Sequence, residues 1–252
     1  MNLLSKIRMR AQKARIIETL KDGDPSPLTR IGTRWGGWSV PASAARPGRT
    51  AVCVGAGEDI SFDVELNKMG MTVFTLDPTP RAKTHVQKVL AGAQEGAQVA
   101  VNNSPTECYD FAGFNRSRFT FVDVGVWKED QVTEFFAPKD SRHVSHSIVN
   151  LQGTHDSFEA KCMRLQTFCS SFNVGEIDIL KLDIEGAEYA VLQDLVTSGI
   201  RPKVLCVDFD EGNSPLDRHY MTRIADAIRS LKEAGYRFLQ VDGWNLLFVF
   251  AQ

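Results

Sequence analysis

From Thr50 onward, short apolar runs alternate with segments of helical periodicity, and this alternation constrains the fold more than any other feature of the sequence. The apolar runs predict strands at 51–55, 71–76, 118–124, 177–182 and 203–209. The periodic segments predict helices at 60–69, 80–91, 156–173, 186–198 and 217–234. Strands that alternate with helices form βαβ units, so we expect a doubly wound α/β fold with a mostly parallel sheet.

Two further apolar segments predict antiparallel pairing. The run at 132–137 is strand-like, and we expect it to form a hairpin with the preceding strand. Near the end of the chain, the runs 236–241 and 245–250 flank the tight turn Asp242-Gly243 and predict a second hairpin. With the parallel strands, this terminal hairpin completes a predicted seven-stranded sheet. Nicotinamide-binding Rossmann domains usually lack such an ending.

Residues 1–48 predict a lead-in segment, followed by a single domain at 49–252. Basic residues outnumber acidic ones in the first part of the lead-in, and apolar residues recur there at helical spacing, which predicts a basic amphipathic helix. We expect its apolar stripe to pack on the domain, with attachment to a membrane surface as the alternative. The segment 22–47 is rich in glycine, proline and tryptophan, so we expect little regular structure in it.

Charge, hydropathy and cysteine content exclude several classes of protein. The formal net charge is −2, so we expect no nucleic-acid partner, because phosphate binding normally requires a basic excess. The apolar stretches are all shorter than the roughly 20 residues of a membrane span. The five cysteines form no CxxC pair, and Cys53 and Cys206 lie in apolar runs, which favours reduced core residues in a cytoplasmic protein.

The first predicted strand ends in a glycine turn, Gly55-Ala56-Gly57, and glycines at such a turn let the backbone approach a ligand. A pyrophosphate-binding turn has a third glycine about three residues further on. This chain has Glu58 and Asp59 there, whose carboxylates would repel a pyrophosphate and would suit a cofactor with a cationic amino group and a sulfonium. The alternative is a plain turn between a strand and a helix.

Asp77 ends the second predicted strand, about twenty residues after the glycine turn. A carboxylate at this place can accept hydrogen bonds from both ribose hydroxyls of an adenosine. Pro78 stiffens the loop that carries it. The alternative is a helix N-cap, because a helix is predicted directly afterwards. In combination with Gly55 and Gly57, Asp77 favours a nucleoside-binding site.

The segment 180–189 begins as a buried strand and ends as the start of a helix. Asp183 and Glu185 lie at the strand end, where open α/β sheets bind ligands, and Glu188 follows within one helical turn. Carboxylates at a helix N-terminus also interact favourably with the helix dipole, which accounts for one or two of them. Three carboxylates so close together exceed what capping requires, so we expect a functional site here.

At these residues the chain resembles the FkbM-type methyltransferases, a branch of the class I S-adenosylmethionine-dependent enzymes. The run LKLDIEGAEYAVL at 180–192 is similar to the hallmark sequence of that family nearly position for position. Supporting similarity extends over 34–41, 54–63, 77–82, 124–127 and 145–152. Many members carry an aspartate and a later glycine around the first glycine turn, where this chain has Cys53 and Asp59.

The resemblance implies a class I methyltransferase fold and S-adenosyl-L-methionine as cofactor. The glycine turn would line the methionine part, Asp77 would hold the ribose, and residues 123–126 would flank the adenine. The full set of implied cofactor-binding residues is Gly55, Ala56, Gly57, Glu58, Asp77, Pro78, Asp123, Val124, Gly125, Val126 and Asp183. Asp183, Glu185 and Glu188 would face the methyl group or the acceptor. The family name implies O-methylation of a hydroxyl on a sugar or small molecule, although the fold serves many acceptors.

Methyl transfer to a hydroxyl requires alignment of the reacting groups and loss of the hydroxyl proton. Our candidate catalytic residues are Asp183 and Glu185, with His146 third. His146 lies in a predicted loop at 139–157 that would cover the pocket, although a histidine in such a polar loop is more often simply exposed. The aromatic residues that could form a wall of an acceptor pocket, or pack in the core instead, are Trp35, Trp38 and Trp127.

An alternative role for the carboxylates is metal binding. Asp208, Asp210 and Glu211 follow the next predicted strand and would lie beside Asp183 and Glu185. Hard oxygen ligands of this kind suit Mg²⁺, which lowers the pKa of a bound hydroxyl. Carboxylates at strand ends more often face water, and no His/Cys ligand cluster is evident. We therefore expect no metal, and activity that survives chelation.

Two other functions stay open on the sequence alone. One is an NAD-type Rossmann oxidoreductase, which the missing third glycine and the terminal hairpin disfavour. The other is a non-catalytic adenosine-binding protein with the same fold, which the acidic run at 183–188 disfavours. The sequence therefore predicts an S-adenosylmethionine-dependent methyltransferase that acts on a hydroxyl of a small molecule or sugar.

Overall fold

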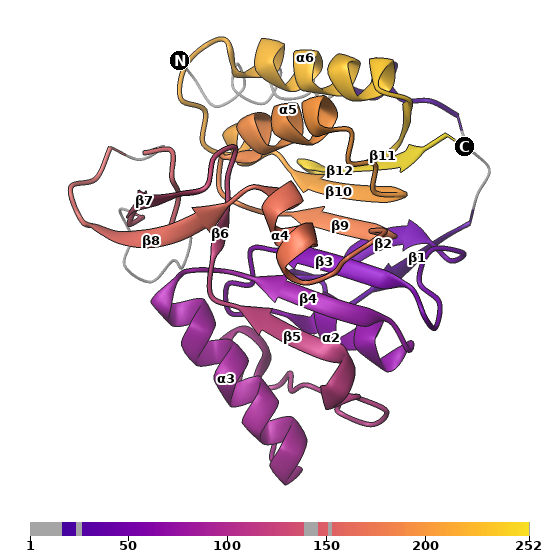
Figure 1. Cartoon of the computed structure of the whole chain (residues 1–252), viewed down its shortest axis with the longest axis vertical. Coiled ribbons are helices and arrows are strands. Elements are labelled where there is room, and N and C mark those ends of the chain that lie inside the picture. Colours follow the sequence, from indigo (N-terminus) through magenta and orange to yellow (C-terminus); the bar gives the residue numbers. More distant parts are fainter. Residues whose placement is uncertain (1–16, 24–26, 139–145, 151–152, 252) are drawn as a thin grey trace.

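A seven-stranded sheet forms the centre of the molecule (Figure 1), in a computed structural model that describes residues 17–23, 27–138, 146–150 and 153–251. The strand order is β11-β12-β10-β9-β3-β4-β5. The strands are β3 (Thr50–Val54), β4 (Thr72–Leu76), β5 (Phe119–Val122), β9 (Ile179–Leu182), β10 (Val204–Asp208), β11 (Tyr236–Asp242) and β12 (Asn245–Phe250). Neighbours from β10 to β5 are parallel, and β12 runs antiparallel to both β10 and β11. The predicted mostly parallel sheet with a C-terminal hairpin is confirmed.

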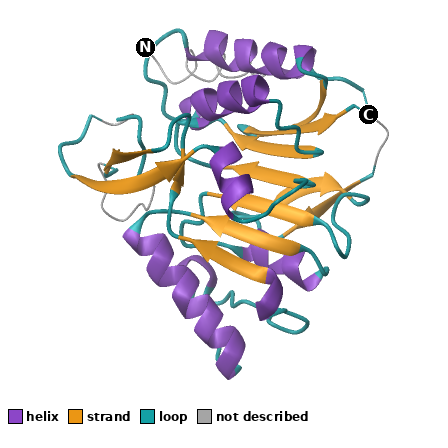
Figure 2. Ribbon diagram, viewed as in Figure 1, coloured by secondary structure: helices purple, strands orange, loops and turns teal. Residues whose placement is uncertain are grey.

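Helices cover both faces of this sheet, as Figure 2 shows. They are α2 (Ser61–Lys68), α3 (Pro80–Glu95), α4 (Leu165–Ser171), α5 (Glu188–Ser198) and α6 (Tyr220–Glu233), with short 3₁₀ helices η1 (Val101–Asn103), η2 (Arg116–Arg118) and η3 (Asp210–Gly212). Buried residues of α4, α5 and α6 pack on one face, and those of α2 and α3 pack on the other. The chain is therefore doubly wound, as predicted.

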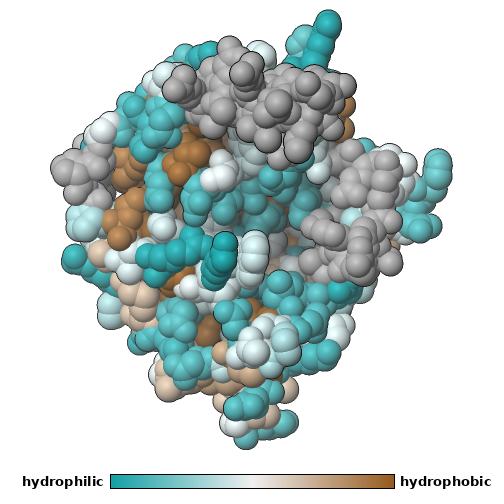
Figure 3. Space-filling view, turned by 180° about the vertical axis from the view of Figure 1, so that it is seen from behind, coloured by the Kyte–Doolittle hydropathy of each residue, from teal (hydrophilic) through white to brown (hydrophobic). Residues whose placement is uncertain are grey.

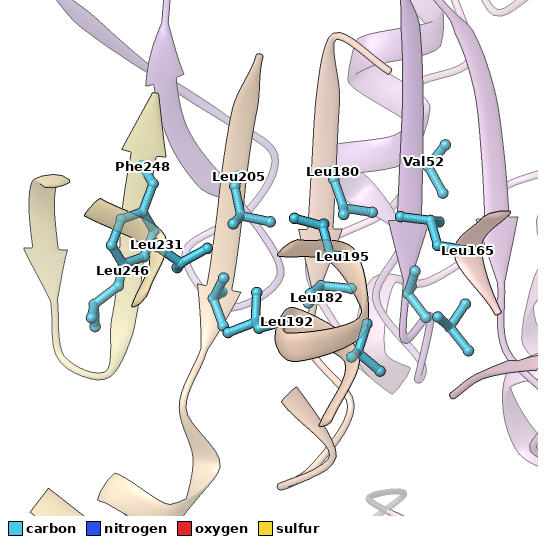
Figure 4. Close-up of a cluster of buried hydrophobic side chains, with 14 of the residues drawn as sticks. Val52, Leu165, Leu180, Leu182, Leu192, Leu195, Leu205, Leu231, Leu246 and Phe248 are labelled. Carbon is cyan, nitrogen blue, oxygen red and sulfur yellow. The ribbon is translucent and has the colours of Figure 1, made fainter. Parts of the chain in front are cut away.

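Alternating side chains of the strands supply the two cores. In β9, Leu180 and Leu182 belong to the core under α5, whereas Ile179 belongs to the core on the opposite face. Figure 4 shows Leu192 and Leu195 of α5 pointing onto the strands of the first core. Because the central strands are buried on both faces, they appear in the sequence as continuous apolar runs, and this is why their positions could be predicted.

A second, three-stranded sheet follows β5 and departs from the prediction. It consists of β6 (Gly125–Val126), β7 (Gln131–Phe136) and β8 (Ser157–Met163), in the order β6-β8-β7. The expected hairpin of 132–137 with the preceding strand is wrong, because β7 pairs antiparallel with β8. The helix expected at 156–173 is also wrong over its first half. Apolar and polar residues alternate along β8, which is a strand period, and only α4 is helical.

The lead-in segment contains regular structure that the sequence did not predict. β1 (Leu28–Ile31) and β2 (Trp38–Pro41) form an antiparallel pair within the glycine- and proline-rich stretch. Ile31, Trp38 and Val40 are buried in the core beside α2. Most of the predicted basic helix lies outside the described residues, and within the described part Ile17 is buried in the core under α6.

The hydrophobic residues visible on the face shown in Figure 3 form small separate patches among hydrophilic ones. Within the described ranges, no helix has the length and apolar character needed to cross a membrane. Large hydrophobic side chains that are exposed include Trp35, whose side chain is 71% exposed. Trp35 lies in the turn between β1 and β2, next to the cavity described below.

Candidate active site

A cavity of about 220 Å³ opens where β3, β4 and β9 end, at the carboxyl edge of the sheet. Ligands bind at this edge in open α/β folds because several loops converge there. The predicted site residues that line the cavity are Gly55, Ala56, Gly57, Glu58, Asp77, Pro78, Gly125, Val126, His146, Asp183 and Glu185. The structure therefore brings together residues that are far apart in the sequence and that the sequence had assigned to one site.

Three residues expected at the site lie elsewhere. Asp123 is exposed and forms an ion pair with Lys83, and Val124 is buried in the core. Neither lines the cavity, whereas the next two residues of that stretch do. Glu188 is fully buried below the cavity wall.

Asp77 holds the glycine turn in shape. Its Oδ2 accepts hydrogen bonds from the backbone N–H groups of Ala56 at 2.8 Å and Gly57 at 3.1 Å. Its Oδ1 accepts from the backbone N–H of Thr79 at 2.8 Å and from the Thr79 hydroxyl at 2.6 Å. Four hydrogen bonds match the acceptor capacity of a carboxylate. Asp77 thus organises the turn itself, and its contact with a ribose stays a prediction.

Asp59 joins the glycine turn to the lead-in segment. Its Oδ2 accepts hydrogen bonds from the Thr33 hydroxyl at 2.6 Å and from the Gly36 N–H at 3.1 Å. Trp35, which lies between these two residues, lines the cavity, one of the two placements that the sequence left open for the tryptophans. The other two pack on the cores, Trp38 as a buried residue and Trp127 as a partly buried one.

Lys181 lies at the centre of the site, although sequence reasoning did not select it. It is 3% exposed, donates a hydrogen bond to the carbonyl oxygen of Gly55, and lies 3.2 Å from Oδ2 of Asp183. Burial lowers its pKa, but Asp183 and the buried Asp63 raise it further, so the net direction is upward. Burial raises the pKa of Asp63 to about 6, and Lys181 opposes that rise. The sequence feature that could have identified Lys181 as a site residue is its position inside an otherwise apolar strand.

The turn after β9 is strained and closely held. Glu185 has a φ of 55°, in the left-handed region that non-glycine residues rarely adopt. The Ser147 hydroxyl donates to the carbonyl oxygen of Glu185. Oε1 of Glu188 accepts from the N–H groups of Ile184 at 3.2 Å and Gly186 at 3.0 Å. Glu188 therefore shapes the turn, and the turn brings Asp183 and Glu185 to the cavity wall.

The next strand ends in two further carboxylates. Burial raises the pKa of Asp208 to about 8, and the negative charges of Asp183 and Glu185 raise it as well. Burial and the same kind of repulsion raise the pKa of Asp210. Glu211 does not join this group, because it is fully buried and its Oε2 lies 2.8 Å from Nε of Arg223. Four acidic side chains thus gather where β9 and β10 end.

A family model described as the methyltransferase FkbM domain matches residues 40–238. The chain belongs to the FkbM methyltransferase family. Residues 40–238 therefore form an S-adenosylmethionine-dependent methyltransferase domain, and the oxidoreductase alternative is wrong. A search of curated protein sequences gave no match.

Solved structures similar to this FkbM domain include methyltransferases with low sequence identity. The FkbM methyltransferase of Methylobacillus flagellatus KT is 14% identical, with a TM-score of 0.41, over 80% of this chain and 44% of that chain. The magnesium protoporphyrin IX methyltransferase of Synechocystis PCC 6803 with bound SAM is 12% identical, with a TM-score of 0.41, over 100% of this chain and 85% of that one. This chain thus spans less than half the length of the Methylobacillus protein.

The charged side chains that line the cavity of the FkbM domain are mostly acidic, and one of them, Glu58, is paired with Arg81. Glu58, Asp59, Asp183 and Glu185 all line the cavity, so its wall suits the cationic amino and sulfonium groups of the cofactor. Lys181 also lines it, but its ammonium group is bound to Gly55 and Asp183. A pyrophosphate would meet repulsion from these carboxylates.

Replacing Asp77 with alanine should weaken cofactor binding by about 1–3 kcal/mol, because the glycine-turn amides lose a charged acceptor. Titration calorimetry with S-adenosylhomocysteine and its 2′-deoxy analogue distinguishes loss of the shape of the glycine turn from loss of a contact with the ribose. If Asp77 also contacts the ribose, the wild type should prefer the ribose form and the variant should lose that preference. An equal loss for both ligands would limit Asp77 to shaping the turn, and unchanged affinity in a folded variant would contradict both roles.

Proposed function

We propose that this FkbM domain transfers a methyl group from S-adenosylmethionine to a hydroxyl oxygen of a small molecule or sugar. The observation that carries the proposal is the pair of carboxylates, Asp183 and Glu185, on the wall of the cavity at the end of β9. The cofactor supplies an electrophilic methyl group when bound. A hydroxyl acceptor has to be oriented and to lose its proton, and a positioned carboxylate can perform both tasks.

Each of the chain's candidate residues would have a defined task. Asp183 is held by the buried Lys181, so its carboxylate has a fixed position from which to orient an acceptor. Glu185 projects from a backbone that Ser147 and Glu188 hold. His146 lines the same cavity, and its ring packs edge-on against Phe158 with centroids 5.3 Å apart. We keep His146 as the third candidate for moving a proton.

Trp35 and Phe135 provide apolar surface on the cavity wall, which suits the face of a sugar ring or a planar small molecule. Replacing Trp35 with alanine should raise the KM for the acceptor by about tenfold, on the scale of an aromatic contact of 0.5–1.5 kcal/mol. The KM for S-adenosylmethionine should stay within about twofold, and Trp35→Phe should recover most of the loss. Steady-state kinetics with both substrates decides this. An unchanged acceptor KM would remove Trp35 from the acceptor site.

The acceptor class can be tested directly. The protein is incubated with S-adenosylmethionine labelled in its methyl group and with extracts of the source organism, and the labelled products are identified by mass spectrometry and NMR. We expect a methyl ether on a small molecule or sugar. Label on nitrogen, or label confined to nucleic acid, would contradict the proposal. Given the net charge of −2 and the buried thiols Cys53, Cys162 and Cys206, we also expect no nucleic-acid partner and a cytoplasmic location.

A further inference from the structure

The ends of β9 and β10 bring three carboxylates within reach of a single ion. Each of Asp183, Glu185 and Asp210 contributes one carboxylate oxygen, and these three oxygens lie within 4.8 Å of one another. The parallel pairing of Leu182 with Val207 sets the two strand ends side by side, so residues from separate βα units meet. The first two carboxylates line the cavity, so the group lies at its wall.

Buried oxygen atoms in and beside this group have no hydrogen-bond partner among the described residues. Oδ1 of Asp208 and Oδ2 of Asp210 are shielded from solvent and accept no hydrogen bond from the residues that the structure describes. The same holds for Oε2 of Glu188, whose side chain is fully buried. An ionised carboxylate in such surroundings is destabilised unless a cation lies beside it. The lack of hydrogen-bond partners for these oxygens is a second observation, separate from the clustering of the carboxylates.

The described basic side chains nearby have other partners as well. Lys181 contacts Asp183 but also binds the Gly55 carbonyl, and Arg223 pairs with Glu211 and Asp217. Among the described residues, no lysine or arginine forms an ion pair with Asp208 or Asp210. Within the described part of the chain, the carboxyl groups that gather at the ends of β9 and β10 thus outnumber the basic side chains in contact with them.

We propose that Asp183, Glu185 and Asp210 bind one divalent cation of the hard, oxygen-preferring type, Mg²⁺ or Mn²⁺, with Asp208 behind them. Carboxylate oxygens are the ligands that such ions prefer. This inference deepens the proposed function and rests on it, because a cation at this wall would contact an acceptor hydroxyl and lower its pKa. It reverses the expectation from the sequence, which could not show that these carboxylates converge within 4.8 Å of one another.

The test measures ion binding without any assay of methyl transfer. Binding of Mn²⁺ to the full chain is followed by electron paramagnetic resonance, with and without S-adenosylhomocysteine, and Mg²⁺ is added as competitor. We expect one Mn²⁺ per chain. Asp210→Asn should weaken binding by at least the roughly 10–100-fold that loss of a supporting group costs a metal site. Asp226→Asn, which removes an exposed carboxylate of α6, should bind Mn²⁺ as the wild type does.

Absence of Mn²⁺ binding at millimolar concentrations, in both cofactor states, would overturn the inference. Equal affinities of the Asp210→Asn and Asp226→Asn variants would overturn it too. Circular dichroism confirms that each variant is folded, and Asp208→Asn serves as a second variant if Asp210→Asn is not. The two proposals fail separately. If the protein binds no Mn²⁺ and still methylates a hydroxyl in the presence of EDTA, only the proposed cation site is wrong. If it binds Mn²⁺ but methylates an atom other than a hydroxyl oxygen, only the proposed acceptor class is wrong.

Discussion

Replacing Lys181 with methionine should lower the free energy of unfolding by about 3–5 kcal/mol, the usual cost of removing one partner from a buried ion pair. The side chain of Lys181 is 3% exposed, and its ammonium group interacts with Asp63 and Asp183 and donates to the carbonyl of Gly55. Methionine fills a similar volume but leaves the buried Asp63 carboxylate without its cation. Urea unfolding followed by circular dichroism measures the change.

Two further variants test whether the loss of stability comes from the buried charge. Lys203→Met removes an ammonium group that pairs with Glu176 and Asp178 at a more exposed position, so it should cost no more than about 1 kcal/mol. In Lys181→Met/Asp63→Asn the uncompensated charge is gone, and part of the lost stability should return. If Lys181→Met and Lys203→Met are equally destabilising, the buried lysine has no special structural role.

Replacing Asp183 with asparagine, or Glu185 with glutamine, should lower kcat by about 10²-fold or more for at least one of the two, the scale expected for losing a positioned base. Each amide keeps the shape of the side chain and removes its charge. Cofactor affinity should change by less than about tenfold, because the contacts of the glycine turn with Asp77 remain. Steady-state assays with the identified acceptor measure kcat, and calorimetry with S-adenosylhomocysteine measures cofactor affinity.

Glu159→Gln is the control, since Glu159 is an exposed carboxylate of β8 outside the cavity. It should leave kcat and cofactor affinity unchanged. Near-normal turnover in both Asp183→Asn and Glu185→Gln would assign these carboxylates to the structure of the turn. The proton acceptor would then have to be His146 or a group of the acceptor molecule itself.

The parts of the fold that were predicted correctly are those that one local pattern determines. The central strands are buried on both faces, so β3, β9 and β10 appear as apolar runs near their observed positions. The segment 156–173 failed because a strand of alternating polarity is followed at once by α4, and one helical assignment was extended over both. The β1–β2 pair was not predicted because its stabilising contacts are distant in sequence: Asp59 binds the turn between the strands, and buried residues of both strands pack in the core beside α2.

The site was predicted where a residue type alone identifies a strand end, as for Asp77, Asp183 and Glu185, all of which line the cavity. Burial and pairing were not predictable in this way. No sequence pattern separates Asp123, which pairs with Lys83 on the surface, from the cavity-lining Gly125. Nor could it reveal that Glu188 turns inward to the backbone. Such distinctions depend on which way a side chain points after the elements have packed.

The hydrogen bonds of Asp59 have a practical meaning for the boundaries of this enzyme. The match to the family model starts at residue 40, yet the groups that bind the Asp59 carboxylate, Thr33 and Gly36, precede that point. A fragment that starts at residue 40 would keep every residue of the glycine turn but lose the two groups that donate hydrogen bonds to Asp59. We therefore expect that a fragment needs the residues before position 40 to keep the glycine turn in its observed shape, and expression plasmids should begin before β1.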